Sequence, residues 1–99
     1  MSNNVFKDLD LPNPEIYKLR AELAAGITEI INKRKLTQKQ VAELTGVSQP
    51  DISRLVNGGI ARPGLDSLLK IFLKLGRSIE LVITKQEQNI PTGLYVSMA

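Results

Sequence analysis

The polar residues with the most distinctive spacing lie between Gln49 and Asn57. If this stretch is helical, its apolar residues form one stripe and its polar residues lie on the opposite side. Those polar side chains carry amide, hydroxyl and guanidinium groups, which can hydrogen-bond to base edges in the major groove and to phosphates. The sequence therefore predicts a surface that binds duplex DNA. Its outward residues are Gln49, Pro50, Ser53, Arg54 and Asn57.

Two short helices joined by a tight turn would position this surface. Thr37 is the predicted N-cap of the first helix, and Gly46 can end it because glycine adopts positive φ without a Cβ clash. Ser48 is the predicted N-cap of the second helix. Asp51 follows three residues later, where its carboxylate could reach back to the N–H of the cap and complete a capping box. Gly58 then ends this helix.

This segment, TQKQVAELTGVSQPDISRLVNG, resembles the helix-turn-helix of the lambda-repressor/Cro-like group, also called the XRE family. The resemblance implies that the second helix is the recognition helix and that Gln38 contacts a phosphate or braces that helix. It makes Gln49, Ser53 and Arg54 candidates for reading bases. Pro50 departs from the polar residue common at its position but could still touch a thymine methyl. The matching residues are Thr37-Gln38, Ala42, Gly46-Val47-Ser48-Gln49, Ile52-Ser53-Arg54-Leu55 and Asn57-Gly58.

Positive charge is concentrated around this motif. From Lys33 to Arg62 there are six basic and two acidic residues, which gives +4, whereas the rest of the chain carries −1. Such an asymmetry is expected of a protein that meets phosphates, although a solvated lysine face would look the same without the motif. For Arg54 the alternative role is a salt bridge to Asp51. The full predicted DNA-binding set is Thr37, Gln38, Lys39, Ser48, Gln49, Pro50, Ser53, Arg54, Asn57 and Arg62.

The composition argues against catalysis and metal binding. The chain has no cysteine and no histidine, so it lacks disulfides, the usual nitrogen and sulfur metal ligands and the usual general base. Its carboxylates occur singly, and it has no glycine-rich phosphate loop. We predict no enzymatic activity, no cofactor and no metal. We also expect neither a signal peptide nor a membrane span, and a cytoplasmic, nucleoid-associated protein.

The apolar pattern predicts a mainly all-α fold, a four- to five-helix lambda-repressor-like helix-turn-helix domain with one C-terminal β-strand used for dimerisation. We expect an N-terminal arm over 1–13, the helical DNA-binding domain over 14–76, the dimerisation strand over 77–85 and a tail over 86–99. Gly26, inside the first helix, suggests a close helix crossing. The predicted core contains Ile27, Ile31, Val41, Ile52, Leu55, Leu68 and Phe72.

The strand prediction comes from alternation between apolar and polar residues over 78–84. Ile79, Leu81 and Ile83 would lie on one face, and an unpaired strand is not stable alone. Pairing with a second copy across a two-fold axis would give a homodimer suited to a palindromic operator. Residues 4–7 or 94–97 could instead pair with it within one chain. The tail is either a frayed terminus or a segment that docks on a partner protein through Leu94, Tyr95 and Val96.

These features together predict a sequence-specific, DNA-binding transcriptional repressor. The whole chain also resembles the HigA-like antitoxins of the XRE family, on the arm VFKDLDLPNPE, the central motif and the segment GRSIELVI. The resemblance implies autoregulation of a type II toxin–antitoxin operon and a RelE/HigB-like toxin as partner. The arm around Phe6 and the tail around Tyr95 are the candidate toxin contacts. A stand-alone, phage-type regulator without a toxin is the alternative.

Overall fold

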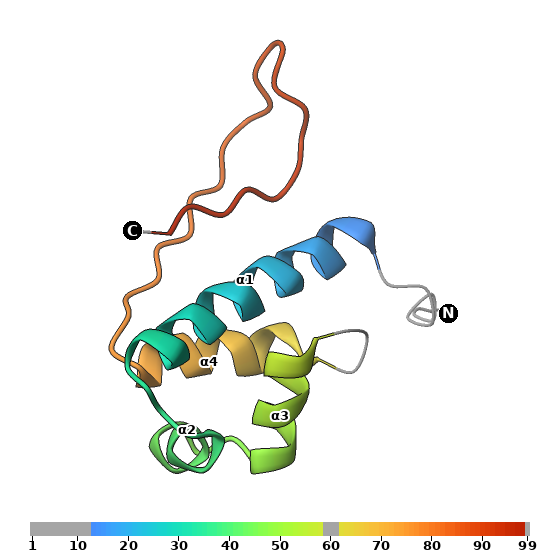
Figure 1. The fold of residues 1–99 in the computed structure, drawn as a ribbon. Helices are drawn as coiled ribbons and strands as arrows, with labels where there is room; N and C mark the ends of the chain where they lie inside the picture. Colours follow the sequence, from blue (N-terminus) through green and yellow to red (C-terminus); the bar gives the residue numbers. More distant parts are fainter. Residues whose placement is uncertain (1–12, 59–61, 99) are drawn as a thin grey trace.

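Four α-helices form the part of the chain that this computed structural model describes, residues 13–58 and 62–98 (Figure 1). The predictions for the N-terminal arm lie outside these residues. The helices follow one another without an intervening strand, which confirms the mainly all-α fold. They are α1 (Pro14–Lys33), α2 (Gln38–Thr45), α3 (Gln49–Asn57) and α4 (Leu65–Lys74).

Side chains and one glycine fix the helix ends close to the predicted positions. Asn13 Oδ1 accepts from the N–H of Glu15 at 2.8 Å at the start of α1. Thr37 Oγ1 accepts from Gln40 N at 3.0 Å, and Gln40 Oε1 accepts from Thr37 N at 2.8 Å, which is a complete capping box on α2. Gly46, at φ 76°, ends α2 in the left-handed conformation.

The start of α3 differs from the prediction in one respect. Ser48 is its N-cap, and Ser48 Oγ accepts from the N–H of Asp51 at 3.3 Å. The predicted return contact, from the Asp51 carboxylate to the N–H of Ser48, is wrong. The carboxylate binds the Arg54 guanidinium instead, because an arginine one turn along the helix offers it a charged donor.

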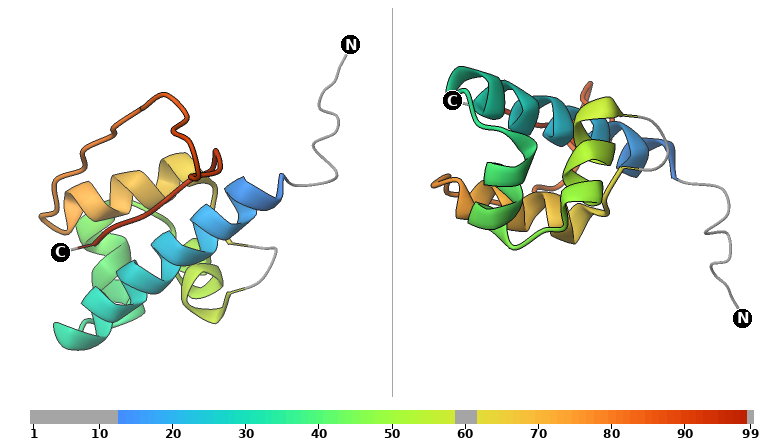
Figure 2. Two further views of the ribbon diagram at one scale, coloured as in Figure 1. Left: turned by 90° about the horizontal axis from the view of Figure 1, so that it is seen from above. Right: turned by 60° about the horizontal axis from the view of Figure 1, so that its bottom comes forward.

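The core lies between α1, α3 and α4, with α2 closing one end (Figure 2). Every residue predicted for the core is buried, because each lies on the apolar stripe of an amphipathic helix. Each fully buried aliphatic side chain contributes roughly 1.5–3 kcal/mol relative to exposure. The buried apolar residues are Leu23, Ala24, Ile27, Ile30, Ile31, Val41, Val47, Ile52, Leu55, Leu68, Ile71, Phe72 and Leu75.

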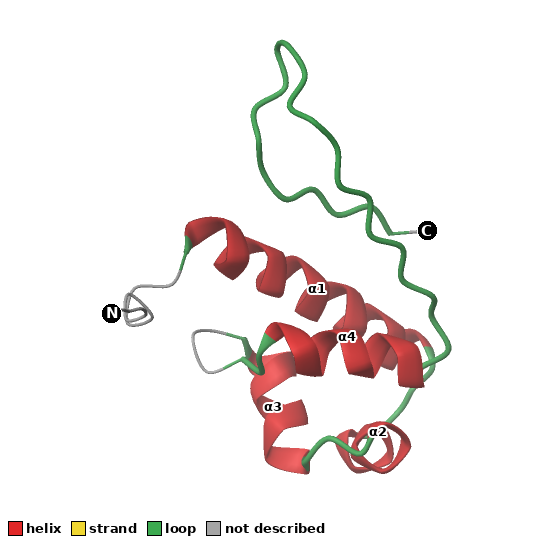
Figure 3. Ribbon diagram, turned by 180° about the vertical axis from the view of Figure 1, so that it is seen from behind, coloured by secondary structure: helices red, strands yellow, loops and turns green. Residues whose placement is uncertain are grey.

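The chain leaves α4 as an extended segment that contains no strand within the described residues (Figure 3). Leu81 and Ile83 are 79% and 96% exposed there. Residues 94–97 make no backbone hydrogen bond with this segment, and Val96 packs on the helical core instead, so that intrachain alternative is wrong for the residues described. Residues 4–7 lie outside them. Pairing through Ile79, Leu81 and Ile83 with a second copy stays a prediction.

The end of the tail is docked rather than frayed. Val96 packs on the core, the N–H of Leu94 donates to Glu15 Oε1 at 3.3 Å, and Tyr95 donates its hydroxyl hydrogen to Pro91 O at 2.7 Å. Met98 lies against Gly26, where a Cβ would collide with the Met98 sulfur and lie 3.4 Å from Phe72 Cζ. Because Gly26 has no side chain, both Met98 of the tail and Phe72 of α4 can pack close to α1 at this point.

Candidate nucleic-acid interface

A buried threonine fixes the turn between α2 and α3. Thr45 is 1% exposed, its Oγ1 donates to Val41 O at 2.7 Å, and the same oxygen accepts from Val47 N at 3.2 Å. Because both hydrogen bonds are buried, they fix the path of the chain into Ser48 and α3. The sequence analysis did not select Thr45. Its position directly before the terminating glycine was the available signal.

The N-terminal ends of α2 and α3 meet at one surface. Gln38 of α2 and three residues of α3, Gln49, Pro50 and Ser53, line an open hollow of about 380 Å³. Gln49 and Pro50 are exposed, whereas Gln38 and Ser53 are half-buried. The structure thus brings the predicted phosphate-contacting glutamine beside three of the predicted groove-facing residues. This arrangement presents amide and hydroxyl groups together at the start of α3.

Two hydrogen-bonded pairs lie along the outer side of α3. Arg54 Nη2 donates to Asp51 Oδ1, and Asn57 Nδ2 donates to Ser53 Oγ at 3.2 Å. The hydrogen bond from Arg54 holds the pKa of Asp51 below its ordinary value. Desolvation opposes this shift, and the Arg54 charge and a hydrogen bond with Ser48 add to it. The salt bridge considered for Arg54 is therefore present, and Arg54 is nevertheless partly exposed.

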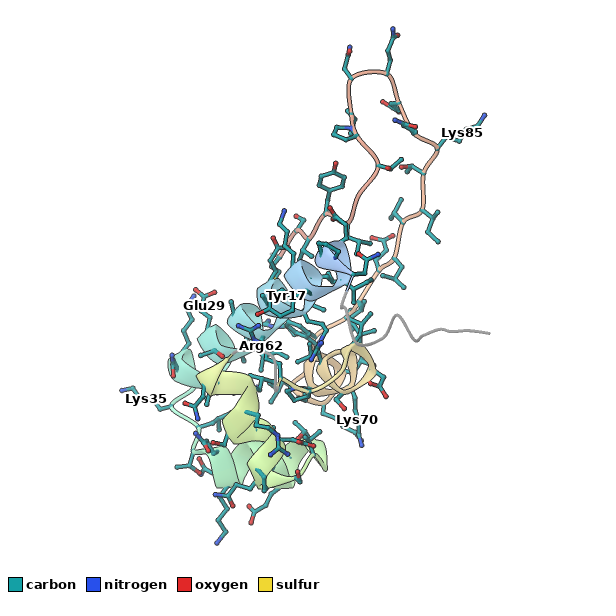
Figure 4. The ribbon with its side chains drawn as sticks, turned by 90° about the vertical axis from the view of Figure 1, so that its right-hand side faces the viewer. Tyr17, Glu29, Lys35, Arg62, Lys70 and Lys85 are labelled. Atoms are coloured by element: carbon teal, nitrogen blue, oxygen red, sulfur yellow. The ribbon has the colours of Figure 1, made fainter. Side chains whose placement is uncertain are left out.

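The capping residues and Lys39 flank this surface. Thr37 and Ser48 are exposed, but their side-chain oxygens already accept hydrogen bonds within α2 and α3. Lys39 is exposed on α2 beside Gln38. Lys35, just before α2, is also exposed and points outward near the junction of α1 and α2 (Figure 4).

Other basic residues of this region already bind groups within the protein. Lys33 pairs with Glu29 at 3.7 Å, and Arg34 Nη1 donates to Leu75 O at 3.1 Å. Lys35 and Lys39 are exposed at the predicted DNA-binding end, and Arg54 is exposed there as well but is paired with Asp51.

Arg62 lies outside the hollow lined by Gln38, Gln49, Pro50 and Ser53, and of the predicted residues it shares a second hollow with Asn57. Its guanidinium is close to Gly58, where Nη2 would be 3.1 Å from an added Cβ, and this second hollow lies between α1 and the end of α3. Arg20 of α1 donates from Nε to Pro63 O at 3.2 Å and from Nη2 to Arg62 O, which ties this loop to α1. Sequence reasoning missed Arg20, because nothing near it in the chain indicates a partner 43 residues away.

The described residues contain no group of three or more carboxylates that could hold a metal ion. Within the same residues, no helix is both long and apolar enough to cross a membrane.

Comparison with known proteins assigns this arrangement to a family. Residues 5–84 match the family described as "Helix-turn-helix domain". An uncharacterized HTH-type transcriptional regulator of Haemophilus influenzae is 39% identical over 82 residues, which cover 80% of this chain and 82% of that protein.

Two solved structures share the fold. One, provisionally described as an XRE family transcriptional regulator, superposes with a TM-score of 0.77 at 24% identity, over 89% of this chain and 99% of that one. The other, described as a toxin–antitoxin module from Streptococcus pneumoniae, has a TM-score of 0.55 at 30% identity, over 82% of this chain and 94% of that one. The chain therefore belongs to the helix-turn-helix family of DNA-binding transcriptional regulators, and it has the fold of the XRE-family structure.

Proposed function

We propose that this protein is a sequence-specific transcriptional repressor that binds a palindromic operator as a homodimer. The observation that carries the proposal is the shared surface of Gln38, Gln49, Pro50 and Ser53, with Arg54 exposed beside it. In helix-turn-helix proteins, the N-terminal residues of the second helix of the motif contact base edges in the major groove. The polar surface at the start of α3 fits that role.

Each residue of the surface has a proposed task. Gln49 can form two hydrogen bonds to adenine, and Arg54 can form two to O6 and N7 of guanine. Gln38, Lys35 and Lys39 would contact phosphates and set the register of the protein on the duplex. Thr37, Ser48 and Asn57 contribute at the edges of the same contact.

The extended segment over residues 77–85 supports the homodimer part of the proposal. Its apolar side chains at Leu81 and Ile83 are largely exposed, and its backbone makes no ladder with the rest of the described chain. Antiparallel pairing with the same segment of a second copy would satisfy these backbone groups. Leu81→Glu with Ile83→Glu should convert the dimer to a monomer in sedimentation velocity. Thr84→Glu, on the other face of the segment, is the control.

We further propose that the protein is the antitoxin of a type II toxin–antitoxin pair and represses its own operon. The similarity to the pneumococcal toxin–antitoxin module supports this assignment over a stand-alone, phage-type regulator. Co-expression with the neighbouring reading frame and pull-down should recover a small basic RelE/HigB-like ribonuclease. A neighbouring gene that encodes no such protein would favour the stand-alone regulator.

The decisive experiment is a mobility-shift and footprinting assay on DNA directly upstream of the gene. We expect protection of a palindromic site. Lys35→Glu with Lys39→Glu should weaken binding to all sequences and reduce the salt dependence by about two phosphate contacts per protomer. The control is Lys18→Glu with Lys74→Glu, which makes the same change in charge at exposed positions of α1 and α4. Equal losses in the two double variants would contradict the proposed surface.

A further inference from the structure

An exposed carboxylate on α3 needs an explanation. Asp51 lies on the helix proposed to enter the groove, and a carboxylate close to phosphates weakens binding by repulsion. The N-cap does not require its charge, because the cap uses the backbone N–H of Asp51, with Ser48 Oγ as acceptor. Its carboxylate is therefore available for another role.

The carboxylate holds one end of the Arg54 side chain. Arg54 Nη2 donates to Asp51 Oδ1, with the two side chains 47% and 39% exposed. A guanidinium has five N–H donors, and this contact leaves those on Nη1 and Nε for a second acceptor. The pair is one helical turn apart, so α3 itself fixes the distance between the two groups.

We propose that Asp51 is a positioning residue that sets base specificity by orienting Arg54. This inference rests on the proposed function, because it requires α3 to lie in the major groove. A free arginine side chain can reach either a guanine edge or a phosphate, and contacts to phosphate do not discriminate between sequences. Asp51 restricts that choice before DNA binds and lowers the conformational entropy lost on contact.

The test compares Asp51→Asn with the wild type on the operator and on operators that are substituted at one base pair in each half-site. Removal of the negative charge should raise affinity for random DNA several-fold. Preference for guanine at the Arg54 position should fall about tenfold at the same time. Glu43→Gln removes one exposed negative charge from α2 without touching Arg54 and is the matched control. It should leave the preference intact.

A double variant separates positioning from simple repulsion. Arg54→Ala should abolish the same guanine preference, and Asp51→Asn combined with Arg54→Ala should lose no further preference, because both changes remove one contact. Asp51→Glu, which keeps the carboxylate, should retain most of the preference. Thermal melts of every variant check that the fold is intact.

Two outcomes would overturn the inference. One is an Asp51→Asn protein that binds all sequences more tightly by the same factor and keeps its guanine preference. The other is a double variant that loses clearly more preference than Arg54→Ala. A wild-type protein that protects no operator would instead overturn the proposed function, so the two failures can be told apart.

Discussion

Ser48, Asp51 and Arg54 form a short hydrogen-bonded chain at the start of α3. Ser48 caps the helix, and Asp51 accepts from Arg54 one turn further along. The three residues thus link the end of the helix to a side chain proposed to read DNA. A pair this exposed contributes little to the free energy of folding, and its importance is to orientation.

The lowered pKa of Asp51 predicts a small acid sensitivity. Its folded pKa lies below the ordinary value of 3.8, so the carboxylate stabilises the fold fully above that pH and loses the contribution as pH falls through the folded value. Melting temperature measured from pH 6 to pH 2.5 should therefore fall further for the wild type than for Asp51→Asn. The melting temperature of Arg54→Ala should also fall less at acid pH than that of the wild type. Parallel curves for all three proteins would contradict this reading.

The α2–α3 element depends on backbone geometry at its turn. Gly46 ends α2 at φ 76°, and the buried hydroxyl of Thr45 binds both sides of the turn. No side chain crowds Gly46, where an added Cβ would meet only Lys70 Nζ at 3.7 Å. Substitution there consequently tests the backbone conformation rather than packing.

Gly46→Ala should destabilise the protein by about 1–2 kcal/mol, because the Cβ of alanine lies too close to the backbone in the left-handed conformation. Gly46→Asn should lose less, since asparagine tolerates that region. Urea unfolding of the three proteins measures the difference. Equal stability of Gly46→Ala and the wild type would mean that the turn has another conformation.

Thr45→Val tests the second support of this turn. The substitution keeps the shape of the side chain but leaves the buried N–H of Val47 without its acceptor. We expect a loss of about 1–3 kcal/mol in urea unfolding. Thr45→Ser, which keeps the hydroxyl, should lose less, and a Thr45→Val protein as stable as the wild type would contradict this account.

Elements of this kind were predictable because their signals are local. The caps at Asn13, Thr37 and Ser48 and the apolar stripes of the helices depend on residues within one or two turns, so the sequence indicates them directly. The contact of Arg20 with the loop before α4 and that of Met98 with Gly26 join distant parts of the chain. Nothing local marks such partners. The sequence could not decide whether the Asp51 carboxylate would accept from the Ser48 N–H or from Arg54, because both partners lie within one helical turn of it.

At the scale of the whole molecule, the tail extends from the helices at the side away from α2 and α3 (Figure 1). The molecule measures 42 × 33 × 18 Å. Residues 94–98 return to the core and close the tail into a loop, with Val96 and Met98 as its apolar contacts. Gly26 provides the space for this return.

Gly26→Ala should show whether the position of Met98 depends on the missing side chain at Gly26. Alanine stabilises a helix by about 1 kcal/mol relative to glycine, but its Cβ would displace Met98. The gain should appear in full in a Met98→Ala background and be smaller in the otherwise unchanged chain. Urea unfolding of the four proteins at one concentration gives the interaction energy.

The control is Ala25→Gly, a change at the neighbouring exposed position, which should have the same effect in both backgrounds. An equal gain from Gly26→Ala in both backgrounds would show that Met98 does not occupy this place.

The loop over residues 86–92 and helix α3 lie at opposite ends of the molecule, which bears on how complexes assemble (Figure 1). A macromolecule that binds this loop leaves the start of α3 accessible. In a mobility-shift assay, adding such a molecule to the protein–operator complex should slow the complex further and should not release free duplex.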